Sequence, residues 1–349
     1  MSTSAPIRFL VEPFQVRVAA ATLLGAITAI EAGHLARVGR PVTFVYGQVA
    51  LAPIIRDLLM LANGCFHTAT NFESCEAALT PTFMREIEVL QPGIAKALAT
   101  FGLGLETLAG QGETAVRTRS TGQQSAAAAS DLSDLLARLQ IAGDRQNLLV
   151  EVSQTEPGNP RHFTLYLPGT ANWSPNTGKS VFDLTSNFAA MSGPGVSAPE
   201  RAALQALAKA DFGGQAGDQL TIAGYSEGGL AGANLISSGA ITAMGGSLLG
   251  LVAVASPISS VSLPVGTKVL AIEHYRDPVP QLDLAERPDS RNWQTVKLAQ
   301  SDWLGHSLSG YRSSLASMAA ELRASLNHKF SSLFSAGQAT LLQFEASRS

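Results

Sequence analysis

The five residues Gly224-Tyr225-Ser226-Glu227-Gly228 have the spacing Gly-x-Ser-x-Gly. This spacing suits a nucleophilic serine on a sharp turn between a strand and a helix, because flanking glycines let the two backbones pass close together. Residues 220–223 form an apolar, β-branched run typical of a buried strand, and residues 228–236 are rich in small residues typical of a packed helix. In a chain with 32 glycines the pattern alone is weak, but its setting makes Ser226 a candidate nucleophile.

An acidic residue and a histidine follow Ser226 along the chain, each after an apolar run. Residues 265–275 have the pattern of a buried strand and lead to Asp277, and residues 293–298 form the next strand-like run before His306. Because the carboxyl ends of parallel strands meet at one edge of a sheet, we expect these three side chains to lie together. The order Ser, Asp, His predicts a catalytic triad.

In such a triad His306 Nε2 removes the hydroxyl proton of Ser226 during attack and returns it to the leaving group. Asp277 accepts the Nδ1 proton and fixes the tautomer of the ring. We expect His274, which lies within a strand-like run, to be a packed residue. The alternatives left open are Asp283 or Asp289 as the acid and His274 as the base.

The strand-like run at 162–167 is followed by the loop Pro168-Gly169-Thr170-Ala171. In a site of this kind, one backbone N–H of the loop and the N–H of the residue after the nucleophile bind the oxyanion. We assign the first donor to Thr170 or Ala171 and the second to Glu227. The carboxylate of Glu227 would oppose the developing negative charge, so we expect its side chain to point away.

A long polar connection covers residues 174–199 and carries several large apolar side chains that could line a substrate entrance. The candidates around the site are Trp173, Tyr225, Phe182, Phe188 and Met191.

The remaining apolar runs predict an α/β protein. A Pro- and Gly-containing turn separates strand-like runs at 148–153 and 162–167, which predicts a hairpin. Later strand-like runs at 248–255, 265–275 and 293–298 alternate with helical stretches that include 199–208 and 228–236; another helix is expected over 131–141. This pattern predicts a mostly parallel sheet with helices on both faces.

Two regions are expected along the chain. Residues 13–109 carry mainly helical patterns, and residues 110–130 are polar, small and rich in Gln, Ser and Ala, which indicates a linker or an exposed loop. We therefore predict a mainly helical N-terminal region over 1–125, serving as a support, cap or lid, and a catalytic domain over 126–349.

Composition excludes several classes of function. A net charge of -3 provides no basic footprint for nucleic acid. The run Gly178-Lys179-Ser180 ends like a phosphate-binding loop, but that motif needs a glycine five residues earlier, where the chain has Trp173. No cysteine or histidine cluster has the spacing of a zinc site. We therefore expect no metal and no cofactor.

The two cysteines, Cys65 and Cys75, are either buried thiols or a disulfide that closes a short loop. The compartment is therefore left open between the cytoplasm and, if the disulfide forms, the outside of the cell. The apolar run at 18–30 is too short to cross a bilayer and continues with helical spacing, so we expect an amphipathic helix and no transmembrane span. Contact with a membrane surface and the oligomeric state are left open.

Several fragments carry a family resemblance: Leu-Pro-Gly-Thr-Ala-Asn-Trp-Ser-Pro, Val-Phe-Asp-Leu-Thr-Ser-Asn, Gly-Tyr-Ser-Glu-Gly-Gly, His-Tyr-Arg-Asp-Pro-Val-Pro-Gln-Leu-Asp and Arg-Asn-Trp-Gln-Thr-Val. Together they resemble a little-characterised group of bacterial, mainly actinobacterial, α/β-hydrolases. The Gly-Thr pair after a strand, Asp-Pro-Val-Pro and His-Ser-Leu-Ser-Gly-Tyr are also similar to lipases of the class 3 type. The resemblance covers residues 148–315.

This resemblance implies an α/β-hydrolase fold and a serine esterase or lipase that forms an acyl-enzyme through Ser226, Asp277 and His306. The chain departs from the pattern at Glu227, where Gln or Leu is more usual. It also has a spacer of only 29 residues between Asp277 and His306. That spacer leaves little room for a lid, so a lid would come from the N-terminal region or from 174–199.

Two other functions fit the same residues. An acyltransferase or a thioesterase could use the same triad and the same acyl-enzyme. In the other case the hydrolase part is a degenerate scaffold, and the protein binds a partner or a membrane surface without catalysis.

Overall fold

The computed structural model describes residues 115–172, 178–192, 197–275, 277, 279–283, 285, 287, 288, 290–299 and 306–348. The chain divides into two units, Met1–Ala97 and Leu98–Ser349, and every described residue belongs to the second. The predicted helical N-terminal region up to residue 114, both cysteines and the apolar run at 18–30 lie outside the described residues.

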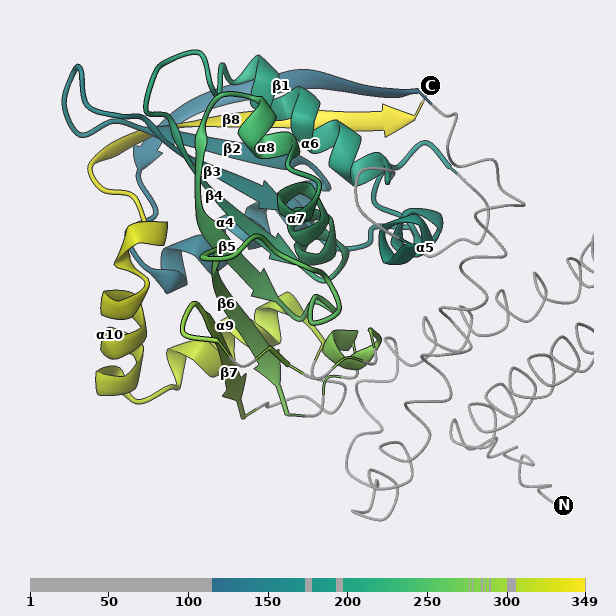
Figure 1. The fold of residues 1–349 in the computed structure, drawn as a ribbon, viewed down its shortest axis with the longest axis vertical. Coiled ribbons are helices and arrows are strands. Elements are labelled where there is room, and N and C mark those ends of the chain that lie inside the picture. Colours follow the sequence, from purple (N-terminus) through teal and green to yellow (C-terminus); the bar gives the residue numbers. More distant parts are fainter. Residues whose placement is uncertain are drawn as a thin grey trace, which may run out of the picture. The chain divides into compact units, whose positions relative to one another are not determined.

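One eight-stranded sheet forms the framework of the described part, with the strand order β1-β8-β2-β3-β4-β5-β6-β7 (Figure 1). The four pairs β3–β4, β4–β5, β5–β6 and β6–β7 are parallel. The pairs β1–β8, β8–β2 and β2–β3 are antiparallel. The strands are β1 (Val116–Ala127), β2 (Leu148–Ser153), β3 (His162–Leu167), β4 (Gln219–Tyr225), β5 (Ser247–Val254), β6 (Lys268–His274), β7 (Trp293–Leu298) and β8 (Gln338–Arg348).

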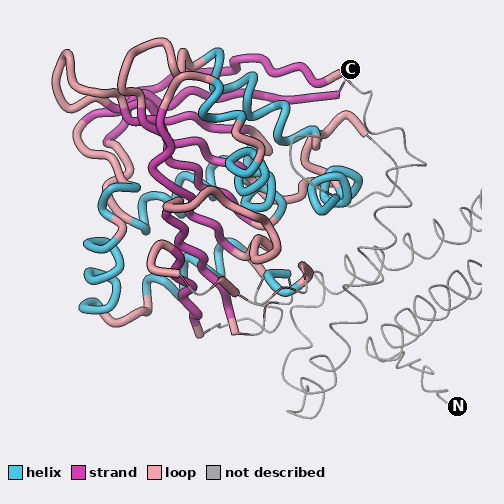
Figure 2. Tube along the Cα trace, in the orientation of Figure 1, coloured by secondary structure: helices cyan, strands magenta, loops and turns pink. Residues whose placement is uncertain are grey.

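Helices cover both faces of this sheet, as the tube in Figure 2 also shows. One face carries α6 and α7, and the other carries α4 and α9. The helices are α4 (Leu132–Arg145), α5 (Leu184–Ser192), α6 (Ala198–Lys209), α7 (Glu227–Ser237), α8 (Ala240–Ala243), α9 (Leu308–Ala316) and α10 (Ala320–Lys329), with short 3-10 turns η3 (Val279–Gln281) and η4 (Ser331–Leu333). The predicted α/β architecture, a mostly parallel sheet covered on both faces, is confirmed.

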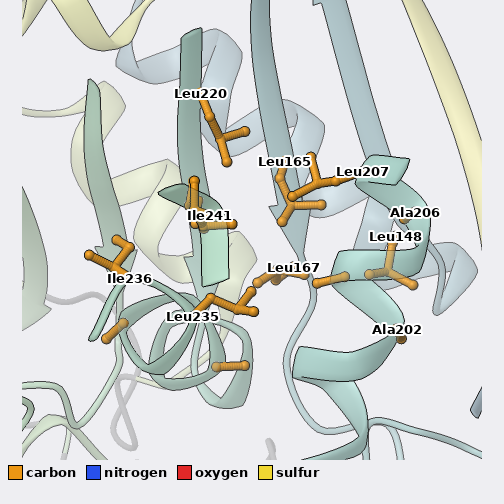
Figure 3. Close-up of a cluster of buried hydrophobic side chains, with 14 of the residues drawn as sticks. Leu148, Leu165, Leu167, Ala202, Ala206, Leu207, Leu220, Leu235, Ile236 and Ile241 are labelled. Carbon is orange, nitrogen blue, oxygen red and sulfur yellow. The ribbon is translucent and has the colours of Figure 1, made fainter. Parts of the chain in front are cut away.

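Two apolar cores result, because successive side chains of a strand point to opposite faces. In β3, Phe163, Leu165 and Leu167 pack toward α6 and α7, whereas Tyr166 packs toward α4 and α9. Figure 3 shows the first of these cores, with leucines of the sheet against Ala202, Ala206 and Leu207 of α6 and against Leu235 and Ile236 of α7. Strands that are apolar on both faces are therefore required here, as the sequence predicted.

Helix α4 shows how local sequence sets an element. The Asp131 side chain accepts a hydrogen bond from the N–H of Asp134 at 2.9 Å, which caps the first turn. Leu132, Leu135, Leu136 and Leu139 follow at helical spacing and are buried. The helix ends where Gln146 adopts a left-handed backbone, with φ 52°.

A linker or an exposed loop was expected over residues 110–130, but Val116–Ala127 form a strand. That strand, β1, pairs with β8 from Val116↔Arg348 to Ala127↔Gln338. Its residues are mostly exposed because β1 is the outer strand of the sheet. Main-chain ladder bonds need no apolar side chains, so a polar, small-residue sequence can still form an edge strand. The expectation of a linker is therefore wrong over Val116–Ala127.

The other strands match the expectations closely. The predicted hairpin is confirmed by the antiparallel pairing of β2 with β3. The runs predicted at 220–223, 248–255, 265–275 and 293–298 correspond to β4, β5, β6 and β7.

Candidate active site

Ser226 lies on the turn that joins β4 to α7. Its backbone has φ 54° and ψ -120°, a strained conformation for a residue with a side chain, and its N–H donates to Val254 O at 2.8 Å. A Cβ on Gly224 would lie 2.4 Å from Gly228 O, and one on Gly228 would lie 2.2 Å from Leu167 O. The two glycines are therefore required by the close approach of the strand, the turn and the neighbouring loop.

The structure brings the three predicted triad residues together. His306 Nε2 lies 3.0 Å from Ser226 Oγ, and His306 Nδ1 lies 2.9 Å from Asp277 Oδ2 and 3.1 Å from its Oδ1. The Asp277 side chain is fully buried, whereas 23% of the His306 side chain is exposed. Ser226 follows β4, Asp277 follows β6 and His306 comes after β7. An imidazole held between a hydroxyl and a buried carboxylate can take a proton from the hydroxyl.

Asp277 is held by two further donors. The N–H of Val279 donates to Asp277 Oδ1 at 2.9 Å, and the Tyr311 hydroxyl donates to Asp277 Oδ2 at 2.7 Å. The same Tyr311 oxygen accepts the N–H of His274 at 2.8 Å. Burial and the nearby Asp277 raise the pKa of the Tyr311 hydroxyl, so it remains a donor. Sequence reasoning missed this role; the Tyr in His-Ser-Leu-Ser-Gly-Tyr was the only signal for it.

Two of the alternative residues, Asp283 as the acid and His274 as the base, have described side chains, and both contact other groups. Asp283 accepts the N–H groups of Ser259 and Ser260 at 2.5 and 3.1 Å. His274 is buried, with its ring stacked on Tyr311 at 3.7 Å between centroids. It is a packed residue, as expected. The third alternative, Asp289, lies outside the described residues.

Tyr225, predicted to line the substrate entrance, instead contacts His306. Its hydroxyl donates to the main-chain oxygen of His306, and its ring is stacked on the imidazole with 5.3 Å between centroids. These contacts fix the height and the tilt of the imidazole above Ser226.

The loop after β3 lies directly beside the nucleophile. A Cβ on Gly169 would be 3.2 Å from the Cβ of Ser226, so the backbone at Gly169 and Thr170 runs past the serine. Of the two predicted loop donors, Ala171 is corrected: its N–H already donates to Phe182 O at 2.9 Å. Within the described part of the chain, the backbone N–H groups of Thr170 and Glu227 have no acceptor. These two can serve as oxyanion donors.

Glu227 has an unusual side chain for this position. It is 1% exposed, and neither of its carboxyl oxygens makes a hydrogen bond with a described residue. Burial, with a smaller contribution from nearby Asp183, raises the pKa of Glu227 well above its ordinary value. Burial therefore favours the uncharged form of this carboxyl group, and the uncharged form would not oppose an oxyanion.

The predicted lining residues divide into three groups. Phe182 is 2% exposed and belongs to the core beneath α6 and α7, so its assignment to an entrance is corrected. Met191 is partly buried against the same core. Trp173 and the side chain of Phe188 lie outside the described residues.

The described ranges were compared with the requirements of two other kinds of site, a metal centre and a membrane span, and meet neither. They contain no group of three or more His, Cys, Asp or Glu side chains able to hold a metal ion. They also contain no helix long and apolar enough to span a membrane. Comparisons with protein-family models, with curated proteins and with solved structures found no match, so function is argued from the site itself.

Proposed function

We propose that this protein is a serine hydrolase that cleaves carboxylic esters through an acyl-enzyme, on an α/β-hydrolase fold. The single observation that carries the proposal is the continuous contact from Ser226 Oγ to His306 Nε2 at 3.0 Å and from His306 Nδ1 to Asp277 at 2.9 Å. Backbone strain at a residue with a side chain is typical of functional sites, and Ser226 combines such strain with an aligned triad. This combination favours an active enzyme over a degenerate scaffold.

The fold supports the same proposal. Ser226 lies between a strand and a helix near the middle of the sheet, and the acid and base follow strands on one side of it, in the order Ser, Asp, His. This is the order and placement of the α/β-hydrolase fold. The family resemblance to bacterial α/β-hydrolases and class 3 type lipases extends the proposal to an esterase or lipase.

The reaction follows from the contacts. His306 takes the proton of Ser226 as the hydroxyl attacks the ester carbonyl, and Asp277 stabilises the imidazolium that forms. The N–H groups of Thr170 and Glu227 receive the oxyanion, and one such donor contributes about 3 kcal/mol. His306 returns the proton to the leaving alcohol, and a water activated by the same imidazole then cleaves the acyl-enzyme.

A series of p-nitrophenyl esters from acetate to palmitate, with and without a lipid interface, tests this function. We expect turnover by the wild type and a loss of about 10³-fold or more in Ser226→Ala. Ser256→Ala is the matched control, since Ser256 is also buried and a Cβ on Gly229 of α7 would meet its Oγ. Equal activity of Ser226→Ala and wild type would contradict the proposal. Added alcohol that captures most of the acyl group would identify an acyltransferase.

A further inference from the structure

Glu227 combines two features that rarely occur in one residue. Its backbone begins α7 and supplies one of the two N–H groups beside Ser226. Its carboxyl group is fully enclosed and has no hydrogen-bond partner among the described residues. A buried carboxylate without a partner carries a large desolvation cost, whereas the neutral acid carries a much smaller one.

The nearby cation, Arg348, forms its ion pair with Asp183 and not with Glu227. Arg348, at the end of β8, donates to both carboxylate oxygens of Asp183, one of them at 3.1 Å. Asp183 also accepts the Thr185 hydroxyl at 2.7 Å and the Ser186 N–H at 2.9 Å. The positive charge of Arg348 is therefore matched by Asp183. An ionised Glu227 would add a second negative charge to this buried pair.

Glu227 also lies close to Thr170, in the loop that supplies the second N–H donor. Thr170 Oγ1 accepts a hydrogen bond from Asn187 Nδ2 at 2.6 Å, so the proton of the Thr170 hydroxyl remains available to Glu227. Thr170 and Arg348 both oppose the rise in the pKa of Glu227, but burial and Asp183 outweigh them.

We propose that Glu227 is a positioning residue that works as a neutral carboxylic acid: it lies close to Thr170 and keeps the oxyanion site free of a second negative charge. This inference rests on the proposed function, because it concerns the same oxyanion. It predicts that ionisation of Glu227 at alkaline pH slows ester hydrolysis. A charge at this place, in a medium of effective dielectric constant about 20, lowers kcat/KM by about 10- to 100-fold.

Two measurements on the full chain test the inference. Infrared difference spectra between wild type and Glu227→Gln, recorded as the pH is raised, should show the carbonyl stretch of a protonated carboxyl group at neutral pH. The ratio of kcat/KM in Glu227→Gln to that in wild type should then rise by about 10- to 100-fold over the pH range in which this band disappears. If Glu227→Gln does not fold, Glu227→Leu replaces it both in the infrared difference spectrum and in the kcat/KM ratio.

Glu151→Gln is the matched control, because Glu151 is also buried but bonds to Arg138 and to the Ala129 N–H. Its kcat/KM ratio to wild type should not change over the range in which the Glu227 band disappears. The carbonyl band of protonated Glu227 could also persist at every pH at which the protein is folded, with a constant ratio of kcat/KM between Glu227→Gln and wild type. This result also supports the inference, because Glu227 then stays neutral throughout. A carboxylate band of Glu227 at neutral pH overturns the inference. A pH-dependent change in the Glu227 band without a change in the kcat/KM ratio, or the reverse, also overturns it. If the protein shows no turnover of esters, the proposed function is rejected. The infrared spectra need no turnover, so they report the protonation of Glu227 separately.

Discussion

At the residue scale, the site depends on how fully Asp277 is held. Its two oxygens accept the imidazole N–H, the N–H of Val279 and the hydroxyl of Tyr311. These donors fix the plane of the carboxylate, and the carboxylate in turn fixes the imidazole opposite Ser226. Loss of one of these donors should therefore lower catalytic activity.

Replacing Tyr311 by Phe tests this arrangement. The change removes a donor to Asp277 and leaves the buried N–H of His274 without an acceptor, so the free energy of unfolding should fall by about 1 to 3 kcal/mol. We expect kcat to fall about tenfold as well, because the imidazole loses part of its alignment. Urea unfolding and steady-state ester hydrolysis measure the two effects.

The control for this variant is Tyr275→Phe, since Tyr275 is 63% exposed. It should change neither quantity. A Tyr311→Phe protein with the stability and kcat of the wild type would show that Asp277 needs no support from α9.

At the element scale, the turn between β4 and α7 is fixed by backbone approach rather than by side-chain packing. The second glycine of the motif leaves no room for a methyl group, because Leu167 O would lie 2.2 Å from it. The same approach places the loop after β3 beside Ser226, so stability and the oxyanion site depend on one contact.

Gly228→Ala should therefore lower the free energy of unfolding by about 3 kcal/mol or more. Gly143→Ala is the matched control: Gly143 lies in α4, and a Cβ there has no atom within 4 Å. That change should be neutral or stabilise by up to about 1 kcal/mol. Chemical denaturation compares the two, and equal stabilities would argue against the tight turn.

The elements differ in how far the sequence could predict them. The inner strands are apolar on both faces, so their positions follow from composition alone. Strand β1 is mostly exposed, and β8 is paired to it by main-chain bonds between distant parts of the chain. The polar, small-residue sequence of β1 predicts a linker, and the few apolar residues of β8, such as Leu341, Leu342 and Phe344, do not by themselves predict a strand.

The candidate site divides in the same way. Motif spacing and strand order indicated Ser226, Asp277 and His306, because each follows a recognisable strand. The choice of Thr170 over Ala171 depends on one loop hydrogen bond to Phe182, and the role of Tyr311 depends on the packing of α9 behind β6. Tertiary contacts of this kind leave no local pattern in a sequence.

At the scale of the whole molecule, a partly buried histidine lies at the end of the sheet opposite Ser226. His162, at the start of β3, is partly buried, and its Nε2 lies 3.0 Å from Thr221 Oγ1 of β4. Burial lowers the pKa of His162 to about 4. The folded protein therefore resists protonation of this ring in a range where the unfolded chain accepts the proton.

Stability should consequently fall as the pH is lowered from about 6.5, the ordinary value for histidine, to about 4. The folded-state pKa is the lower one, so the unfolded state binds the proton first, and the loss amounts to about 2 to 3 kcal/mol. Urea unfolding at a series of pH values should show a smaller loss in His162→Gln than in wild type. His328→Gln, at an exposed position on α10, should follow the wild-type curve. Identical curves for all three proteins would rule this assignment out.

The central claim is that His306 activates Ser226 as a nucleophile. Reaction with a fluorophosphonate, followed by mass spectrometry of the intact protein and its peptides, tests it most directly. The account predicts one adduct, located on Ser226, and a labelling rate that falls by about 10³-fold or more in His306→Ala. No adduct on the folded protein, an adduct on another residue, or undiminished labelling of His306→Ala would contradict it.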